Sequence, residues 1–157
     1  MIDVHRATED HADGCVAVLA ALPDHFTHDT HDEVRADLRR GTGWVVIEDG
    51  DVAGFVVAVR SFPASAELTF AAVRPEHHRS GIGRSLVDRA VADLAAGGVT
   101  LVEVKTLDAS AGYEPYVATR AFWEQQGFVQ VDRIDPLPGW QPGNPAALYV
   151  AALRPTR

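Results

Sequence analysis

The fold is decided around one stretch in the middle of the chain: Val73-Arg74-Pro75-Glu76-His77-His78-Arg79-Ser80-Gly81-Ile82-Gly83-Arg84-Ser85-Leu86. It reads as the end of a strand, a loop with glycines and the start of a helix. Glycines let a backbone approach a phosphate closely, and the free N–H groups of a first helical turn face such an anion. The stretch therefore predicts a site for a phosphate-bearing ligand, with a tight strand-to-helix turn as the plainer alternative.

Two nucleotide-binding motifs do not fit this stretch. A Walker loop ends in Gly-Lys-Ser/Thr, which is absent here. The dinucleotide fingerprint needs a third glycine where Leu86 stands, and it opens a fold instead of lying in its middle.

Before this stretch, the pattern predicts two short helices, a hairpin and a further strand. Residues 2–6 alternate like a strand, and Thr8 can cap a helix that ends at Pro23. Residues 30–33, Thr-His-Asp-Glu, match a capping box for a second helix, which ends at Gly41.

The hairpin is predicted by two β-rich runs, residues 44–47 and 52–59, on either side of an Asp-Gly step. Residues 66–73 form the next strand, bounded by prolines. Simple alternation places its odd-numbered residues, Glu67 to Val73, on one face, and Leu68 and Phe70 on the other.

After the stretch, apolar residues at helical spacing from Ile82 predict a helix that ends at Gly97-Gly98. A strand over residues 99–107, a helix over 116–126 and closing strands near 128–134 and 148–153 complete the pattern. The fold class is mixed α/β.

Composition narrows the classes of function. The 157 residues carry 14 Lys plus Arg against 22 Asp plus Glu, a net charge of -8, which disfavours nucleic acid and anionic membranes as partners. No signal peptide or membrane span is predicted, so we expect a single soluble domain in the cytoplasm. The one cysteine, Cys15, stands among apolar residues and is expected to be a buried thiol.

The central loop resembles the acyl-CoA pyrophosphate loop of the GNAT acyltransferases, written Gln/Arg-x-x-Gly-x-Gly/Ala, with His78 where Gln or Arg is usual. Residues 121–128, Ala-Phe-Trp-Glu-Gln-Gln-Gly-Phe, look like the family's Phe-Tyr-x-x-x-Gly-Phe segment. Residues 104–107, 116–122 and 144–145 are similar to features of a poorly characterised bacterial branch of the same family.

The resemblance covers almost the whole chain and implies one N-acetyltransferase domain over residues 1–157. It implies an α+β fold of the GNAT type, a mixed, mostly antiparallel sheet of about seven strands flanked by about four helices. It also implies acetyl-CoA as co-substrate, held by backbone near Ala71 and Val73, by residues of the loop, and by Phe122 unless that ring only fills the core. The loop residues expected to bind are His78, Arg79, Ser80, Gly81, Ile82, Gly83, Arg84 and Ser85.

Transfer to an amine needs a base, because an amine with a pKa of about 10.4 is charged at pH 7. The resemblance points to Glu67 as that base, against the alternative of an ordinary exposed strand carboxylate. The family's usual acid, a tyrosine, is replaced by Trp123, whose indole is not a useful proton source. Tyr116 is the nearest substitute, with Tyr113 and Tyr149 as weaker candidates.

Residues 24–32, Asp-His-Phe-Thr-His-Asp-Thr-His-Asp, contain metal-ligand residue types. The helix start expected at Thr30 separates the three histidines, so we expect a solvated loop and no metal. GNAT proteins often form the acceptor pocket at this place, and the mixed Asp, His and Phe character of the segment would suit an amine with an apolar part. The resemblance implies a small-molecule or peptide amine as acceptor.

Two other functions remain open from the sequence alone. The chain could be a non-catalytic acyl-CoA-binding sensor or partner module, which the residues Trp123 and His78 favour, or a scaffold without any co-substrate. The resemblance favours a homodimer.

Overall fold

The computed structural model describes residues 1–154 of the chain. Within them, strands and helices follow in the order β1 (His5–Arg6), α1 (Ala12–Ala20), α2 (Thr30–Arg40), β2 (Thr42–Glu48), β3 (Asp51–Phe62), β4 (Ser65–Val73), α3 (Ile82–Ala96), β5 (Leu101–Leu107), α4 (Val117–Gln125), β6 (Val129–Ile134) and β7 (Ala146–Ala152). Short 3-10 turns precede α1, α3 and α4.

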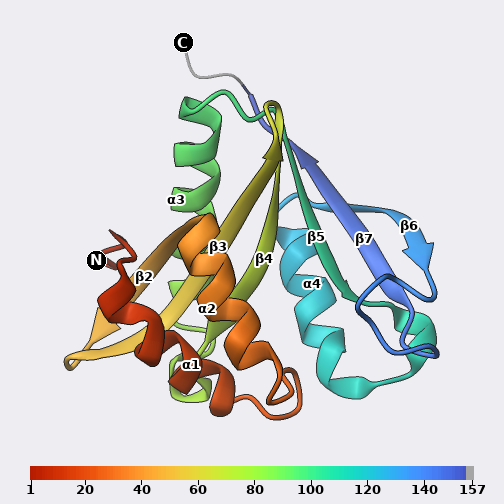
Figure 1. The fold of residues 1–157 in the computed structure, drawn as a ribbon, viewed down its shortest axis with the longest axis horizontal. Coiled ribbons are helices and arrows are strands. Elements are labelled where there is room, and N and C mark those ends of the chain that lie inside the picture. Colours follow the sequence, from red (N-terminus) through yellow and green to blue (C-terminus); the bar gives the residue numbers. More distant parts are fainter. Residues whose placement is uncertain (155–157) are drawn as a thin grey trace.

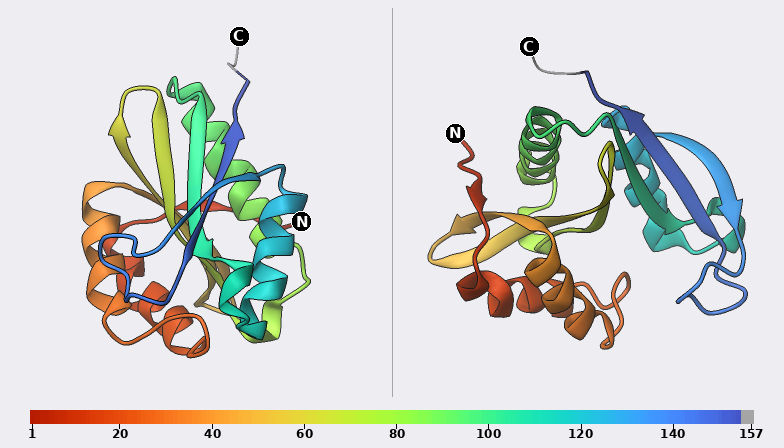
Figure 2. Two further views of the ribbon diagram at one scale, coloured as in Figure 1. Left: turned by 90° about the vertical axis from the view of Figure 1, so that its right-hand side faces the viewer. Right: turned by 45° about the horizontal axis from the view of Figure 1, so that its top comes forward.

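The strands form one sheet in the order β1-β2-β3-β4-β5-β7-β6 (Figure 1). Among the described residues, β4 and β5 are the one parallel pair, and every other neighbouring pair is antiparallel. Helices α1 and α2 cover one face of the sheet, and α3 and α4 cover the other (Figure 2). The predicted mixed sheet of seven strands with four helices is confirmed.

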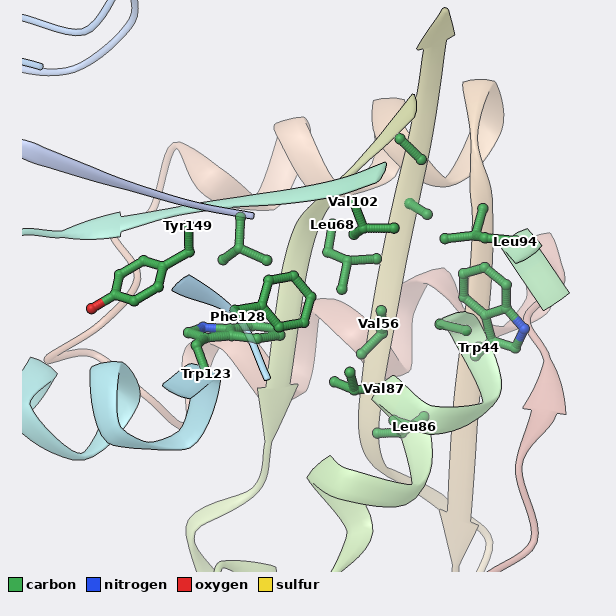
Figure 3. Packing of buried hydrophobic residues seen from close by; sticks show 14 of the residues in the cluster. Trp44, Val56, Leu68, Leu86, Val87, Leu94, Val102, Trp123, Phe128 and Tyr149 are labelled. Atoms are coloured by element: carbon green, nitrogen blue, oxygen red, sulfur yellow. The ribbon is translucent and has the colours of Figure 1, made fainter. Parts of the chain in front are cut away.

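Each face of the sheet has its own apolar core. On the α3 side, Leu86 and Val87 pack beneath Trp44, Val56 and other strand residues (Figure 3). On the α1 side, the core contains the side chain of Cys15, which is fully buried as predicted. Burial raises the pKa of the Cys15 thiol to about 12, so the thiol stays protonated and unreactive at neutral pH.

The predicted hairpin is confirmed as β2 and β3. Its turn residues Asp49 and Gly50 both have positive φ, 52° and 85°, as a type I′ turn requires. Both strands are longer than predicted, because β2 pairs with β3 from Thr42↔Ala58 onward and β3 pairs with β4 as far as Phe62↔Ser65.

Most predicted helices are confirmed with small shifts, but the first elements differ. Strand β1 has two residues instead of five, and Thr8 precedes a 3-10 turn, where its backbone N–H donates to His11 Nδ1 at 2.9 Å. The predicted capping box at Thr30 is wrong. Thr30 is the first residue of α2, and its hydroxyl donates backward to the Thr27 carbonyl at 2.6 Å.

The predicted facing of β4 is also wrong. The register between β3 and β4 shifts from Val57↔Phe70 to Ala58↔Leu68, which leaves Thr69 as an extra residue. This β-bulge reverses the alternation, so Leu68 lies in the core under α3 while Phe70 lies in the core under α1. Glu67 therefore lies on the face of α1 and α2, whereas Ala71 and Val73 pack toward α3.

The Asp108 carboxylate, directly after β5, forms several hydrogen bonds and an ion pair. It accepts from the Ser110 backbone (3.0 Å) and hydroxyl (2.6 Å) and from Gln130 Nε2 (2.7 Å), and Arg133 Nε lies 3.1 Å away. Burial alone would raise the pKa of Asp108, but the hydrogen bonds from Ser110 and Gln130 and the charge of Arg133 outweigh it. Together they lower the pKa to about 2.

This lowered pKa makes a prediction about stability in acid. A carboxylate whose pKa is lower in the folded state stabilises the protein above its unfolded value of 3.8, and the stabilisation is lost as the pH falls toward 2. Asp108→Asn should therefore lower the free energy of unfolding by roughly 2 kcal/mol at pH 6 and by much less at pH 2.5, measured by urea unfolding. Glu48→Gln, at an exposed carboxylate, is the control. Equal effects of Asp108→Asn at both pH values would contradict this role.

Candidate functional site

The strands β4 and β5 separate soon after they meet. Their parallel pairing covers three residue pairs, Ser65↔Leu101, Ala66↔Val102 and Glu67↔Glu103, although β4 continues to Val73 and β5 to Leu107 (Figure 1). The facing edges of the two strands are thus unpaired toward their carboxyl ends. Buried backbone groups normally find partners, so this wedge between β4 and β5 is a place where a ligand can supply them.

Two side chains near the wedge support that interpretation. Among the described residues, the hydroxyls of Thr69 on β4 and Thr106 on β5 are buried and have no hydrogen-bond partner. A buried polar group without a partner costs free energy of about 1–3 kcal/mol. Both residues follow the last paired positions of their strands. Both hydroxyls are thus packed inside the protein at the positions where the two strands separate.

The start of α3 presents free backbone donors beside the end of β4. The amide of Ser85 bonds to the Gly81 carbonyl at 3.0 Å, and the amides of Ile82, Gly83 and Arg84 have no partner within the helix. Gly81 has a φ of +89°, a conformation that favours glycine and that turns the chain into the helix. These three amides and the positive end of the helix dipole are the groups that the predicted anion site requires.

The loop side chains are placed differently from one another. His78 donates from Nε2 to the Val73 carbonyl at 2.7 Å, so it fastens the loop to β4. The Ser80 hydroxyl donates to the His77 carbonyl. Arg79 is exposed and has a positive φ of 63°, and Arg84 is exposed 3.8 Å from Asp88. Both guanidinium groups are exposed, and the ion pair of Arg84 with Asp88 is long, so both can turn toward an anion at the helix start.

The side chain of Phe122, on α4, lies against the start of α3. A Cβ atom added to Gly83 would lie 3.2 Å from Phe122 Cε1, so the ring packs directly over the second residue of α3. The absence of a side chain at Gly83 allows this close approach. Phe122 is only partly buried, which leaves part of its ring beside the loop.

Glu67 lies on the other face of the wedge, in an ion-paired cluster. Lys105 Nζ lies 3.0 Å from Glu67 Oε1 and 3.8 Å from Glu103 Oε1. We call Glu67, Glu103 and Lys105 the acidic cluster. It borders a cavity of about 220 Å³ that Thr69 also lines. Sequence reasoning missed Lys105 and Glu103 because the register of β4 against β5 was unknown, although both stand on one face of a predicted strand.

Tyr116 connects the turn before α4 with the segment that follows α1. Its hydroxyl donates to the His25 carbonyl at 2.7 Å, and the His25 ring donates from Nε2 to the Pro115 carbonyl at 2.9 Å. Tyr113 donates to the Asp24 carbonyl at 2.9 Å. Burial, with the neighbouring Tyr113, raises the pKa of Tyr116 to about 12, so its hydroxyl keeps its proton at neutral pH.

The other aromatic candidates point elsewhere. Trp123 is buried between Phe122 and Phe128, with ring centroids 5.1 Å from each, and it belongs to the core (Figure 3). Tyr149 is buried on β7, and its hydroxyl donates to Glu124 Oε1 at 3.3 Å on α4. Both residues thus serve the packing of α4 against the sheet.

A larger cavity, of about 280 Å³, lies at the opposite end of α3 from the loop. Its arginines are engaged with the protein: Arg60 donates to the Gly97 carbonyl at 2.9 Å, and Arg6 lies 3.4 Å from Asp93. Asp93 also accepts from the Trp44 indole at 2.8 Å. These contacts hold the end of α3 against the sheet, far along the helix from the loop.

The histidines of the segment after α1 are spread. His25 bonds across to Pro115, while the rings of His28 and His31 lie 4.8 Å apart. In residues 1–154, no group of three or more His, Cys, Asp or Glu is arranged to hold a metal ion. Nor is any helix there both long enough and apolar enough to pass through a membrane.

Comparison with known proteins agrees with this geometry. The family model of the acetyltransferase (GNAT) domain matches residues 39–130, which include the hairpin, the wedge, the loop and α4. No curated protein matches the sequence.

Solved structures share the fold over nearly the whole chain. A GNAT-family protein from Desulfovibrio desulfuricans is 22% identical, with a TM-score of 0.82 over 97% of this chain and 99% of that one. An aminoglycoside 6′-N-acetyltransferase complexed with coenzyme A is 17% identical, with a TM-score of 0.75 over 99% of each chain. A GNAT acetyltransferase from Elizabethkingia anophelis with acetyl-CoA bound is 17% identical, with a TM-score of 0.70 over 97% and 98%.

Proposed function

The chain belongs to the GNAT acetyltransferase family, and from this premise we propose which of its residues carry an acetyl group from acetyl-CoA to an amine. The observation that supports the assignment most is the wedge, where two strand edges lack partners, together with the helix start beside it, whose first amides lack partners as well. Acetyl-CoA, the co-substrate, has a pyrophosphate, a chain with amide groups and an activated acetyl thioester to match them.

In this proposal the helix start binds the pyrophosphate. The amides of Ile82, Gly83 and Arg84 donate to phosphate oxygens, and Arg79 and Arg84 add charge. The amide-bearing arm lies along the unpaired edge of β4 near Ala71 and Val73, as an added strand would. His78 acts indirectly by fastening the loop, and Phe122 covers the co-substrate from α4.

Glu67 is the proposed base. An amine with a pKa of about 10.4 is some three units from its neutral form at pH 7, so making it nucleophilic costs about 4 kcal/mol. Glu67 lies at the apex of the wedge and on the face opposite α3, where an acceptor can approach without meeting the loop. Its carboxylate takes the proton of the ammonium, directly or through water.

Tyr116 is the proposed acid for the leaving thiolate. Its hydroxyl is protonated at neutral pH because burial raises its pKa to about 12. To reach the sulfur it would have to leave the His25 carbonyl, so we expect its contribution to be modest. The acceptor is a small-molecule or peptide amine; the cytoplasmic location and the homodimer stay predictions.

The loop assignment predicts the effect of reversing one charge at the start of α3. Arg84→Glu should weaken acetyl-CoA binding at least tenfold in isothermal titration calorimetry, because a carboxylate would face the phosphates. Arg39→Glu makes the same change at an exposed residue of α2 and should leave the dissociation constant within twofold. If both variants bind acetyl-CoA with the same dissociation constant, the phosphates do not bind at the start of α3.

The base assignment predicts a loss of rate without a loss of co-substrate binding. Glu67→Gln should lower kcat by about 10² to 10⁴, measured as release of free CoA, with the dissociation constant for acetyl-CoA unchanged. Tyr116→Phe should lower kcat by less than tenfold. Full activity of Glu67→Gln would exclude Glu67 as base. Binding of acetyl-CoA without turnover of any amine by the wild type would instead favour a non-catalytic acyl-CoA-binding module.

A further inference from the structure

The cavity at the C-terminal end of α3 is lined by arginines from three different elements, and we call it the arginine cavity. It measures about 280 Å³, and Arg6 of β1, Arg40 of α2 and Arg60 of β3 all line it with exposed side chains. Among the described residues, Asp93 of α3 is its one acidic lining residue. The whole chain has a net charge of -8, so the charge of this cavity is opposite to that of the protein as a whole.

Arg60 has partners for its hydrogen bonds but none for its charge. Its Nη1 donates to the Gly97 carbonyl at 2.9 Å, and its Nε donates to the Pro63 carbonyl at 3.1 Å. A carbonyl carries no net charge, and Arg60 forms no ion pair within residues 1–154. A guanidinium also has more N–H groups than these carbonyls use, so Arg60 can donate to an anion in the cavity.

Arg6 is held only loosely by its neighbours. Its Nε lies 3.4 Å from Asp93 Oδ2, which is longer than the roughly 2.7–2.9 Å of a charge-assisted hydrogen bond. That carboxylate already accepts from the Trp44 indole at 2.8 Å and from Arg89 Nε at 3.1 Å. The guanidinium carbon of Arg6 lies 5.4 Å from the centre of the Trp44 ring, a cation–π contact. Arg6 can therefore turn toward an anion without breaking a short hydrogen bond.

The ion pairs around the arginine cavity do not balance. Arg40 is paired with one carboxylate at 2.8 Å, and this pair is neutral. Asp93 is shared by Arg6 and Arg89, which leaves one positive charge, and Arg60 adds a second. The lining residues and their partners thus carry a net charge of +2. Two negative charges on a ligand would neutralise it.

The end of α3 does not cancel this charge. A helix C-terminus has a partial negative charge of about half an elementary charge, carried by its last carbonyl groups. Here these carbonyls are already bonded: Asp93 and Leu94 accept from the Gly97 amide, both at 3.1 Å, and Gly97 accepts from Arg60. Bonding to the end of the helix therefore accounts for Arg60, whereas Arg40 reaches the same cavity from α2 without contacting a carbonyl of α3.

We propose that the arginine cavity binds a small anion with two negative charges, a phosphate or a short dicarboxylate, at a site separate from that of acetyl-CoA. Planar guanidinium groups donate pairs of hydrogen bonds to phosphate or carboxylate oxygens. A volume of about 280 Å³ admits a small molecule but is too small for acetyl-CoA. The start of α3, where we place the pyrophosphate, is at the other end of a helix of 15 residues, roughly 22 Å away.

The indole of Trp44 is a local probe of this cavity, because its Nε1 donates to Asp93 and Arg6 lies over its ring. Its proton–nitrogen NMR signal, identified by its absence from Trp44→Phe, is followed while succinate is added at constant ionic strength. We expect a saturable shift with a Kd below about 5 mM, together with shifts of the Arg60 and Gly97 amides. The indole of Trp123, buried on α4, should not shift.

Three probes test the charge of the ligand. Succinate and inorganic phosphate each carry close to two negative charges at mildly alkaline pH, whereas butanoate has the chain length of succinate and one charge. We expect butanoate to bind at least tenfold more weakly than the better of the other two, and that better probe identifies the ligand as dicarboxylate or phosphate. Equal binding of butanoate would overturn the two-charge rule. Shifts confined to the amides of Ile82, Gly83 and Arg84 would overturn the separate site.

Two variants each remove one of the two uncompensated charges. Arg6→Gln and Arg60→Gln should each weaken binding of the better probe at least fivefold, while the dissociation constant for acetyl-CoA stays the same. Arg39→Gln removes a charge from an exposed residue of α2 outside the cavity and should change the binding of the probe by less than twofold. If Arg60→Gln does not fold, Arg6→Gln decides. Equal binding of the probe by the wild type, Arg6→Gln and Arg39→Gln would overturn the inference.

Discussion

The separation of β4 from β5 is the constraint on which the rest of the structure depends. A parallel pair would normally continue along both strands, yet here it stops after Glu67↔Glu103. The bulge at Thr69 explains part of this, since an extra residue bends and twists a strand. The cost is a pair of unpaired strand edges and two buried hydroxyls. A protein keeps such groups unpaired where a ligand completes them.

Different groups surround the separated strands on the two faces of the sheet. On the face of α3, the loop, the helix start and Phe122 surround the carboxyl end of β4. On the face of α2, Glu67 and Lys105 form an ion pair that borders a cavity. Co-substrate and acceptor can therefore approach the apex of the wedge from opposite sides, which suits direct transfer in a ternary complex. Tyr116, bonded to the His25 carbonyl, ties the segment after α1 to the start of α4.

The features that could be predicted from the sequence are those that depend on residues close together in the chain. The Asp49-Gly50 turn, the helix from Ile82 and the glycine loop depend on residues close in sequence, and all three are where the pattern placed them. The facing of β4 was mispredicted, because a bulge depends on the partner strand and not on alternation. Lys105 was missed as a partner of Glu67 for the same reason, since their contact depends on the register between distant strands. The proposed co-substrate residues were thus easier to predict than the contacts that surround Glu67.

Hydrogen exchange of the backbone amides, measured with and without saturating acetyl-CoA, tests most directly whether the wedge is the co-substrate site. We expect slower exchange for the amides of Ile82, Gly83 and Arg84 and for β4 between Leu68 and Val73, because these groups gain partners from the bound molecule. The cavity at the other end of α3, around Arg60 and Gly97, should exchange at an unchanged rate. Protection confined to that cavity, or no protection anywhere, would show that β4 and β5 separate for another reason.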